Sequence, residues 1–224
     1  MPDWLQAPLA VQASTDNLLR PSDSAGGRRT MRSGESALER SRAMQRGTLV
    51  HRLLQSLPNL AADRRRDAAL GYLARNAADW SEAERDELAT RVLALIEDRR
   101  FAAVFAAGSR AEVSIVGRLE LRGRPLVSGQ IDRLVVTDDA VLIVDFKTNH
   151  NPPSAPAEAP EAYVRQLALY RAVLARLYPQ RSIRTALLWT ESLDFMEILP
   201  PALDAALASL DSAPCALDPA TPRS

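Results

Sequence analysis

The sequence predicts an α/β domain in which a β-hairpin carries polar side chains between layers of helices. Residues 131–136 and 141–146 are two runs rich in β-branched side chains with a polar break between them, which is typical of a hairpin. Apolar residues recur at helical spacing in residues 36–107 and again in residues 161–178. We therefore expect a helical layer first, then a sheet built around the hairpin, then a helix. Further strands are expected at 112–121, 183–189 and 195–199, and a short closing helix at 202–210.

The composition is that of a globular protein without a dominant charge. The chain has 224 residues, of which 46% are hydrophobic, and its formal net charge is zero, so binding to a polyanion would depend on local arginine clusters. Its single cysteine, Cys215, excludes a disulfide framework and any multi-cysteine zinc or iron–sulfur site within the chain. No apolar run approaches the roughly 20 residues that span a bilayer. We expect a soluble, cytoplasmic protein that does not enter membranes.

The domain organisation follows from shifts in composition. Residues 1–34 mix proline, serine, glycine, aspartate and arginine and predict a linker or arm that is partly disordered. Residues 35–212 are expected to form one domain, mainly helical to residue 107 and carrying the catalytic core from residue 108. Residues 213–224 are expected to be a disordered tail. A linker-like beginning also suggests a fragment of a longer protein.

Two helix starts can be recognised in the N-terminal layer. Ser36 with Glu39, and Ser81 with Glu84, have the spacing of a capping box. The first of these helices carries His51 at the edge of its apolar stripe. A histidine at that position is either a structural residue or a metal ligand.

Glu112 is the only acid near the start of the strand expected at 112–121. It is either a further carboxylate of a metal site or, as we favour, a salt-bridge partner.

The hairpin has a register that can be calculated. If residues 138–139 form its tip, paired residue numbers sum to 277, and Asp132 lies directly across from Asp145. Because side chains alternate between the two faces of a strand, Asp145 and Lys147 project together while Phe146 points the other way. One face of the hairpin would then present two acids and one ammonium group.

Such an acidic pair requires a compensating positive charge. Directly opposed like charges destabilise a sheet, and a hard cation such as Mg²⁺ is commonly held by one or two carboxylates. Lys147 is moreover the only lysine in the chain, against 27 arginines, which favours a role that a planar guanidinium cannot fill. The alternatives are a solvated polar hairpin face and an incidental surface lysine.

The helix after the hairpin follows a loop with four prolines, at 152, 153, 156 and 160. Within it, Gln166 and Tyr170 stand four residues apart and share a face. They either border the site, or are a core tyrosine and a flanking glutamine.

These motifs together resemble a known family. The wordings Gly47-Thr-Leu-Val-His51, Gly129-Gln-Ile-Asp132, Asp145-Phe-Lys-Thr148 and Gln166-x-x-x-Tyr170 are similar to the RecB-type nuclease domain of the PD-(D/E)XK superfamily. Within it they look most like the nuclease domain of AddA-type helicase–nucleases, which process DNA double-strand breaks for recombinational repair. The resemblance covers roughly residues 40 to 200. It implies a restriction-endonuclease-like core with a central mixed sheet.

The resemblance also implies roles for individual residues. It makes His51, Asp132, Asp145 and the backbone carbonyl of Phe146 the ligands of Mg²⁺, with Mn²⁺ as a substitute. Asp132, Asp145 and Lys147 would be the catalytic set of a metal-dependent deoxyribonuclease.

The remaining implications concern partners. Gln166 and Tyr170 would border the DNA. Because the chain has no Gly-x-x-x-x-Gly-Lys-[Ser/Thr] loop, ATP would act only through a helicase motor that lies upstream or on a separate chain. An AddB-like subunit is a further implied partner. The alternatives are a DNA-binding scaffold module that no longer cuts, and a stand-alone nuclease of the same superfamily.

Overall fold

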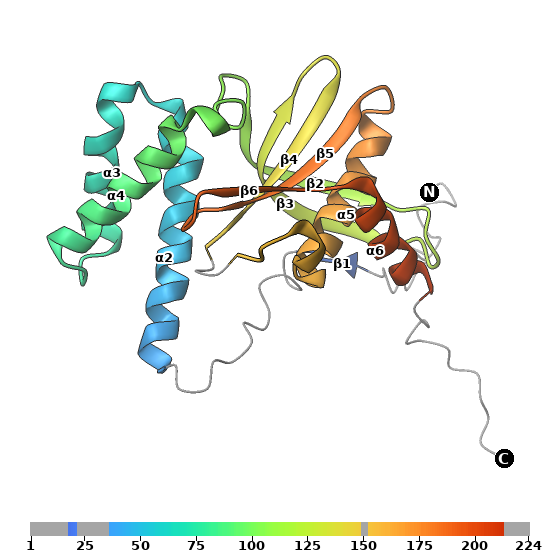
Figure 1. The fold of residues 1–224 in the computed structure, drawn as a ribbon, viewed down its shortest axis with the longest axis horizontal. Helices are drawn as coiled ribbons and strands as arrows, with labels where there is room; N and C mark the ends of the chain where they lie inside the picture. The colour runs from blue at the N-terminus through green and yellow to red at the C-terminus, as the bar shows by residue number, and fades with distance from the viewer. Residues whose placement is uncertain (1–17, 22–35, 149–151, 213–224) are drawn as a thin grey trace, which may run out of the picture.

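The computed structural model describes residues 18–21, 36–148 and 152–212. Within these ranges, a mixed sheet of six strands lies between two layers of helices, which confirms the predicted fold class (Figure 1). Apart from residues 18–21, the expected arm and the expected tail fall outside the described residues, as does Cys215. No helix in the described ranges is long and apolar enough to cross a membrane.

The sheet is organised around one long strand, β3. On one edge β3 pairs antiparallel with β2, and on its other edge it pairs parallel with β1 at its beginning and antiparallel with β4 at its end. β4 in turn pairs parallel with β5, and β5 antiparallel with β6. The strands are β1 (Leu18–Leu19), β2 (Arg110–Arg118), β3 (Leu126–Val136), β4 (Ala140–Lys147), β5 (Ser182–Trp189) and β6 (Asp194–Ile198).

The two helical layers cover opposite faces of this sheet. α2 (Ala37–Ser56), α3 (Ala62–Asn76) and α4 (Glu82–Glu97) form one core with Val144 and Phe146 of β4. α5 (Glu161–Leu177) and α6 (Pro200–Ser212) form a second core with Val141 and Ile143 of the same strand. Short 3-10 turns occur at η2 (Leu57–Asn59), η3 (Arg99–Phe101) and η4 (Pro156–Glu158).

Both predicted capping boxes are present. The Ser36 hydroxyl accepts a hydrogen bond from the Glu39 backbone N–H, and the Glu39 carboxylate accepts one from the Ser36 N–H. Ser81 and Glu84 make the same reciprocal pair at the start of α4. These side chains satisfy backbone donors that the first helical turn leaves unpaired.

The hairpin register is the predicted one. The paired residues run from Arg133 opposite Val144 to Val136 opposite Val141, and every pair sums to 277. At the tip, the Thr137 N–H donates to the Ala140 carbonyl, at 2.9 Å. The regular pairing of β3 with β4 ends at Arg133, one residue before the position of Asp132. The two strands therefore part where the expected site begins.

Candidate active site

The sheet is also irregular between β2 and β3 at this level. Pairing is regular at Ala111 with Arg133 and at Val113 with Ile131, but it skips the position between them, where Glu112 faces Asp132. Glu112 has a φ of 54°, in the left-handed region that non-glycine residues seldom adopt. Such a conformation costs on the order of 1–3 kcal/mol and is concentrated at functional sites. Glu112 and Asp132 are therefore the one opposed pair at this level that the regular backbone pairing of β2 with β3 leaves out.

Three side chains converge at this interruption. His51 Nδ1, from α2, lies 3.4 Å from Asp132 Oδ1. One potential ligand atom from each of His51, Glu112 and Asp132 lies within 4.8 Å of the other two, and all three residues are half-buried. An imidazole nitrogen and two carboxylate oxygens this close together form a donor set that fits a divalent ion.

Asp132 is held in place from its other oxygen. Its Oδ2 accepts a hydrogen bond of 2.7 Å from the Phe146 backbone N–H. The Asp132 side chain thus binds the Phe146 N–H at the level where the regular pairing of the two strands has ended. The Phe146 ring meets the His51 ring edge-on, with centroids 5.9 Å apart. Both potential ligands are therefore oriented by the strand that carries Asp145 and Lys147.

Lys147 lies in an enclosure on the α5 face of the sheet. Its Nζ is 2.5 Å from Asp145 Oδ2, and both side chains are almost fully buried. The ammonium also donates to Gln166 Oε1 at 3.2 Å and lies 3.9 Å from the centroid of the Tyr163 ring. Gln166 Nε2 donates in turn to the Tyr170 hydroxyl at 3.3 Å. Of the predicted pair, Gln166 therefore contacts the lysine and Tyr170 contacts Gln166, while their place beside DNA stays a prediction.

The two predicted carboxylates thus have different partners. Asp132 contacts His51 and the Phe146 amide, while Asp145 contacts Lys147. They still interact electrostatically, because the charge of Asp132 contributes to raising the pKa of Asp145.

Burial and mutual charge shift the site's titrations. Burial raises the pKa of Asp145, and the attraction of Lys147 offsets this only in part. Burial alone would lower the pKa of Lys147, but the negative charge of Asp145 outweighs it and the pKa is raised. Burial opposes protonation of His51 as well, yet its hydrogen bond to Asp132 and the surrounding acids raise its pKa. The pKa of Glu112 is raised by burial and by Asp132. The site thus carries an excess of negative charge, which suits the binding of a cation.

Two glycines of the sequence motifs allow close packing around this site. A Cβ atom added to Gly129 would lie 2.6 Å from the Tyr170 ring, a distance that real Cβ atoms do not show. One added to Gly47 would lie 3.1 Å from Thr148 Oγ1. Gly129 therefore lets α5 approach β3, and Gly47 lets α2 approach the end of β4.

Two residues have more prominent places than the sequence suggested. In the sequence, Tyr163 is only one member of an apolar stripe. Its spacing of three residues from Gln166 nevertheless places both side chains on one helical face. Glu112, for which we favoured a salt bridge, lies with His51 and Asp132. Its proximity to Asp132 depends on the register of β2 with β3. This register cannot be calculated from the sequence, because the connection between the two strands is not a short regular turn.

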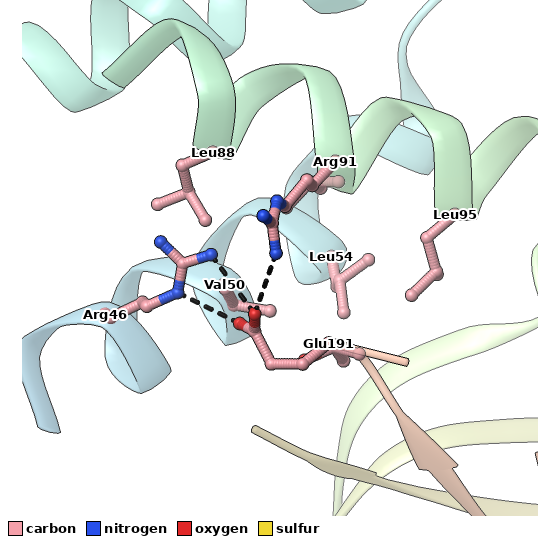
Figure 2. A pocket seen from close by; sticks show the side chains of 9 residues that line it. Arg46, Val50, Leu54, Leu88, Arg91, Leu95 and Glu191 are labelled. Carbon is pink, nitrogen blue, oxygen red and sulfur yellow. Dashed lines mark hydrogen bonds and ion pairs between the residues drawn. The ribbon is translucent and has the colours of Figure 1, made fainter. Parts of the chain in front are cut away.

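An ion-pair network supports the site from the helical layer. Glu191 accepts hydrogen bonds from Arg46 of α2 and Arg91 of α4, and Figure 2 shows both guanidinium groups directed at its carboxylate. The preceding residue, Thr190, donates its backbone N–H to the Lys147 carbonyl at 2.8 Å. The network joins α2 and α4 to the segment that binds the end of β4.

Comparison with known proteins assigns the chain to a family. The sequence matches the model of the PD-(D/E)XK nuclease superfamily over residues 25–202. No curated protein matches the chain. Among the solved structures it is similar to one titled "Crystal structure of SSO0001", with 14% identity over 74% of this chain and 76% of that chain and a TM-score of 0.31. Because the family match covers most of the chain, this protein belongs to the PD-(D/E)XK nuclease superfamily, which implies a metal-dependent nuclease.

Proposed function

We propose that the chain is a DNA nuclease domain that hydrolyses phosphodiester bonds with Mg²⁺. One observation carries this proposal. One hairpin connects the donor cluster, formed by His51, Glu112 and Asp132, with the buried ion pair. The connection arises because its strands carry Asp132 on one side and Asp145 with Lys147 on the other. A cation-binding cluster next to a buried ammonium group is suited to bind and stabilise a phosphoryl group that gains negative charge.

The residues divide the work between holding a cation and neutralising charge. His51, Glu112 and Asp132 would hold the metal ion, with Asp145 and the Phe146 carbonyl as further ligands proposed by resemblance. A divalent ion bound there would polarise a phosphoryl oxygen and favour ionisation of water. Lys147 supplies a compact positive charge for the transition state.

Positioning of Lys147 is the task of its neighbours. Asp145 holds the ammonium group charged, while Gln166 and the ring of Tyr163 fix its direction. Little movement is then needed when negative charge develops on the substrate, and such preorganisation is the main source of electrostatic catalysis.

We place this domain in an AddA-like helicase–nuclease that processes double-strand breaks for recombinational repair in the cytoplasm. The order and wording of the four motifs support this assignment. The helicase motor, which would bind ATP, and an AddB-like subunit are the partners that it implies.

The test is cleavage of end-labelled single- and double-stranded DNA with Mg²⁺. Asp145→Asn should reduce the rate by at least about a hundredfold, because the substitution removes the charge that orients Lys147. Asp138→Asn, at the exposed hairpin tip, is the matched control and should cut like the wild type. Circular dichroism must show that both variants are folded.

The outcome also separates the alternatives. DNA binding without cleavage by the wild type would favour a scaffold module. Rapid cleavage of duplex ends in the absence of any motor would favour a stand-alone nuclease. Equal cleavage by the wild type and Asp145→Asn would contradict the proposed catalytic role.

A further inference from the structure

Arg133 is a buried cation that the proposed chemistry does not use. It follows Asp132 in β3 and is fully buried, with 0% of its surface exposed. None of its three guanidinium nitrogens has a hydrogen-bond partner among the described residues. Most of the other arginines in the described part of the chain are exposed or paired with an acid, so this one differs from them.

Its environment does not compensate the charge. An arginine remains protonated at every physiological pH, and burying an unpaired charge costs several kcal/mol. The contact with the Phe105 ring, whose centroid lies 5.2 Å from the guanidinium carbon, returns about 0.5–2 kcal/mol. The buried Arg133 side chain therefore does not stabilise the fold. A variant with an apolar side chain of similar size at this position should be at least as stable as the wild type.

The Phe105 ring covers one side of the Arg133 guanidinium group. Phe105 is half-buried and stacks on Phe146, but it belongs to the turn segment 102–109 between η3 and β2. The segment is rich in exposed alanines, and at its end Gly108 has a φ of 94° and no atom within 4 Å of an added Cβ. Val104 of this segment is buried in the helical core, so the motion that uncovers Arg133 is that of the Phe105 side chain and not of the whole segment.

The position of Arg133 suggests what it meets once uncovered. It is adjacent in β3 to Asp132, and the rings of Phe105, Phe146 and His51 form a continuous row on the same side of the sheet. A guanidinium group binds phosphate oxygens through two parallel hydrogen bonds. A nucleic acid whose scissile phosphate lies at the donor cluster carries further phosphates to either side of it.

We propose that Arg133 is a second phosphate-binding site, which opens when Phe105 swings away and then holds a neighbouring phosphodiester of the bound strand. This inference rests on the proposed function, because it takes the substrate to be a nucleic acid. Phe105 acts as the gate and Arg133 as the contact. The guanidinium group acts on substrate position and not on the reacting atoms.

The experiment measures binding separately from cleavage. A fluorescent single-stranded oligonucleotide is titrated in EDTA with the wild type, Arg133→Met and Arg133→Lys, with Arg64→Met on exposed α3 as the matched control. Arg133→Met should weaken binding about tenfold, the usual effect of losing a charged hydrogen bond, while Arg64→Met should not. For Arg133→Met, the slope of log affinity against log salt concentration should be smaller than that of the wild type by about 0.7, the equivalent of one phosphate contact on a single strand.

Removal of the gate gives a second readout. Phe105→Ala should bind the oligonucleotide several-fold more tightly, and this gain should disappear in the double variant with Arg133→Met. Arg133→Met should melt at the same or a higher temperature than the wild type, because it removes an unpaired buried charge.

Three results would overturn the proposal. They are unchanged affinity in Arg133→Met, a strongly lowered melting temperature in that variant, which would make Arg133 a structural residue, and a Phe105→Ala effect that persists without Arg133. None of these depends on metal or cleavage. Failure of the Asp145→Asn test would instead remove the nuclease proposal and leave the binding data to be judged alone.

Discussion

Lys147 is held by an acid of its own strand and by two side chains of the neighbouring helix α5. Its uniqueness and the alternation along β4 predicted a functional lysine beside Asp145, and the ion pair between them is present. The contacts with Gln166 and Tyr163 come from α5, whose placement against β4 no local pattern encodes. Side-chain contacts within one element can therefore be predicted from the sequence, whereas contacts between elements are harder to predict.

Lys147→Arg tests whether the enclosure selects an ammonium group. We expect cleavage to fall about a hundredfold although the charge is kept, since a planar guanidinium does not fit between the Asp145 carboxylate and the Tyr163 ring. Steady-state kinetics on labelled DNA measure this, with a thermal melt to confirm folding. Near-normal turnover would show that only charge matters.

Tyr163 is expected to act through the face of its ring. Tyr163→Phe should retain most of the activity, while Tyr163→Leu should lose about three- to thirtyfold in kcat, the range of a desolvated cation–π contact. KM should change little, because the ring contacts Lys147 and not the proposed substrate. A similar loss in both variants would point to the hydroxyl group instead.

At the scale of elements, the hairpin was predictable because a two-residue tip determines every pair that follows it. The end of the pairing was not, because it depends on the Asp132 carboxylate taking the Phe146 amide. The same limit applies to Glu112, where a left-handed backbone conformation interrupts the pairing of β2 with β3 although the sequence there has no glycine or proline.

The capping box of α4 gives a prediction about stability. Ser81→Ala should lower the free energy of unfolding by about 1 kcal/mol, since the Glu84 N–H loses its acceptor. Chemical denaturation measures this, with Ser114→Ala on exposed β2 as the control. Cleavage should be unaffected, because α4 carries none of the proposed catalytic residues.

The contribution of Glu84 to this box depends on pH. Hydrogen bonds from Ser81 lower the pKa of Glu84 in the folded state. Its stabilisation is therefore present above the pKa of the unfolded chain and is lost as pH falls through the folded-state pKa. The difference in stability between wild type and Ser81→Ala should shrink in acid, and a difference that grows in acid would contradict this role.

For the whole molecule, the central expectation is that a divalent ion binds to the folded state alone. An ion present at 100 times its dissociation constant adds about 2.7 kcal/mol to the stability of the folded protein. We expect Mg²⁺ or Mn²⁺ to raise the melting temperature of the wild type, EDTA to reverse it, and Asp132→Asn to abolish the shift. Asp138→Asn should behave as the wild type, and an EDTA-insensitive wild type would argue against a metal site.

The helical layer has a geometric consequence for this site. α2 carries His51, contacts Thr148 at Gly47, and pairs with Glu191 through Arg46. One helix therefore contacts the donor cluster, the residue that follows β4 and the segment that follows β5. The first turns of α2 stand clear of the core, with Leu38 and Met44 mostly exposed. The position of α2 therefore sets where the imidazole lies relative to the hairpin, and a substitution that shifts this helix should disturb the donor cluster.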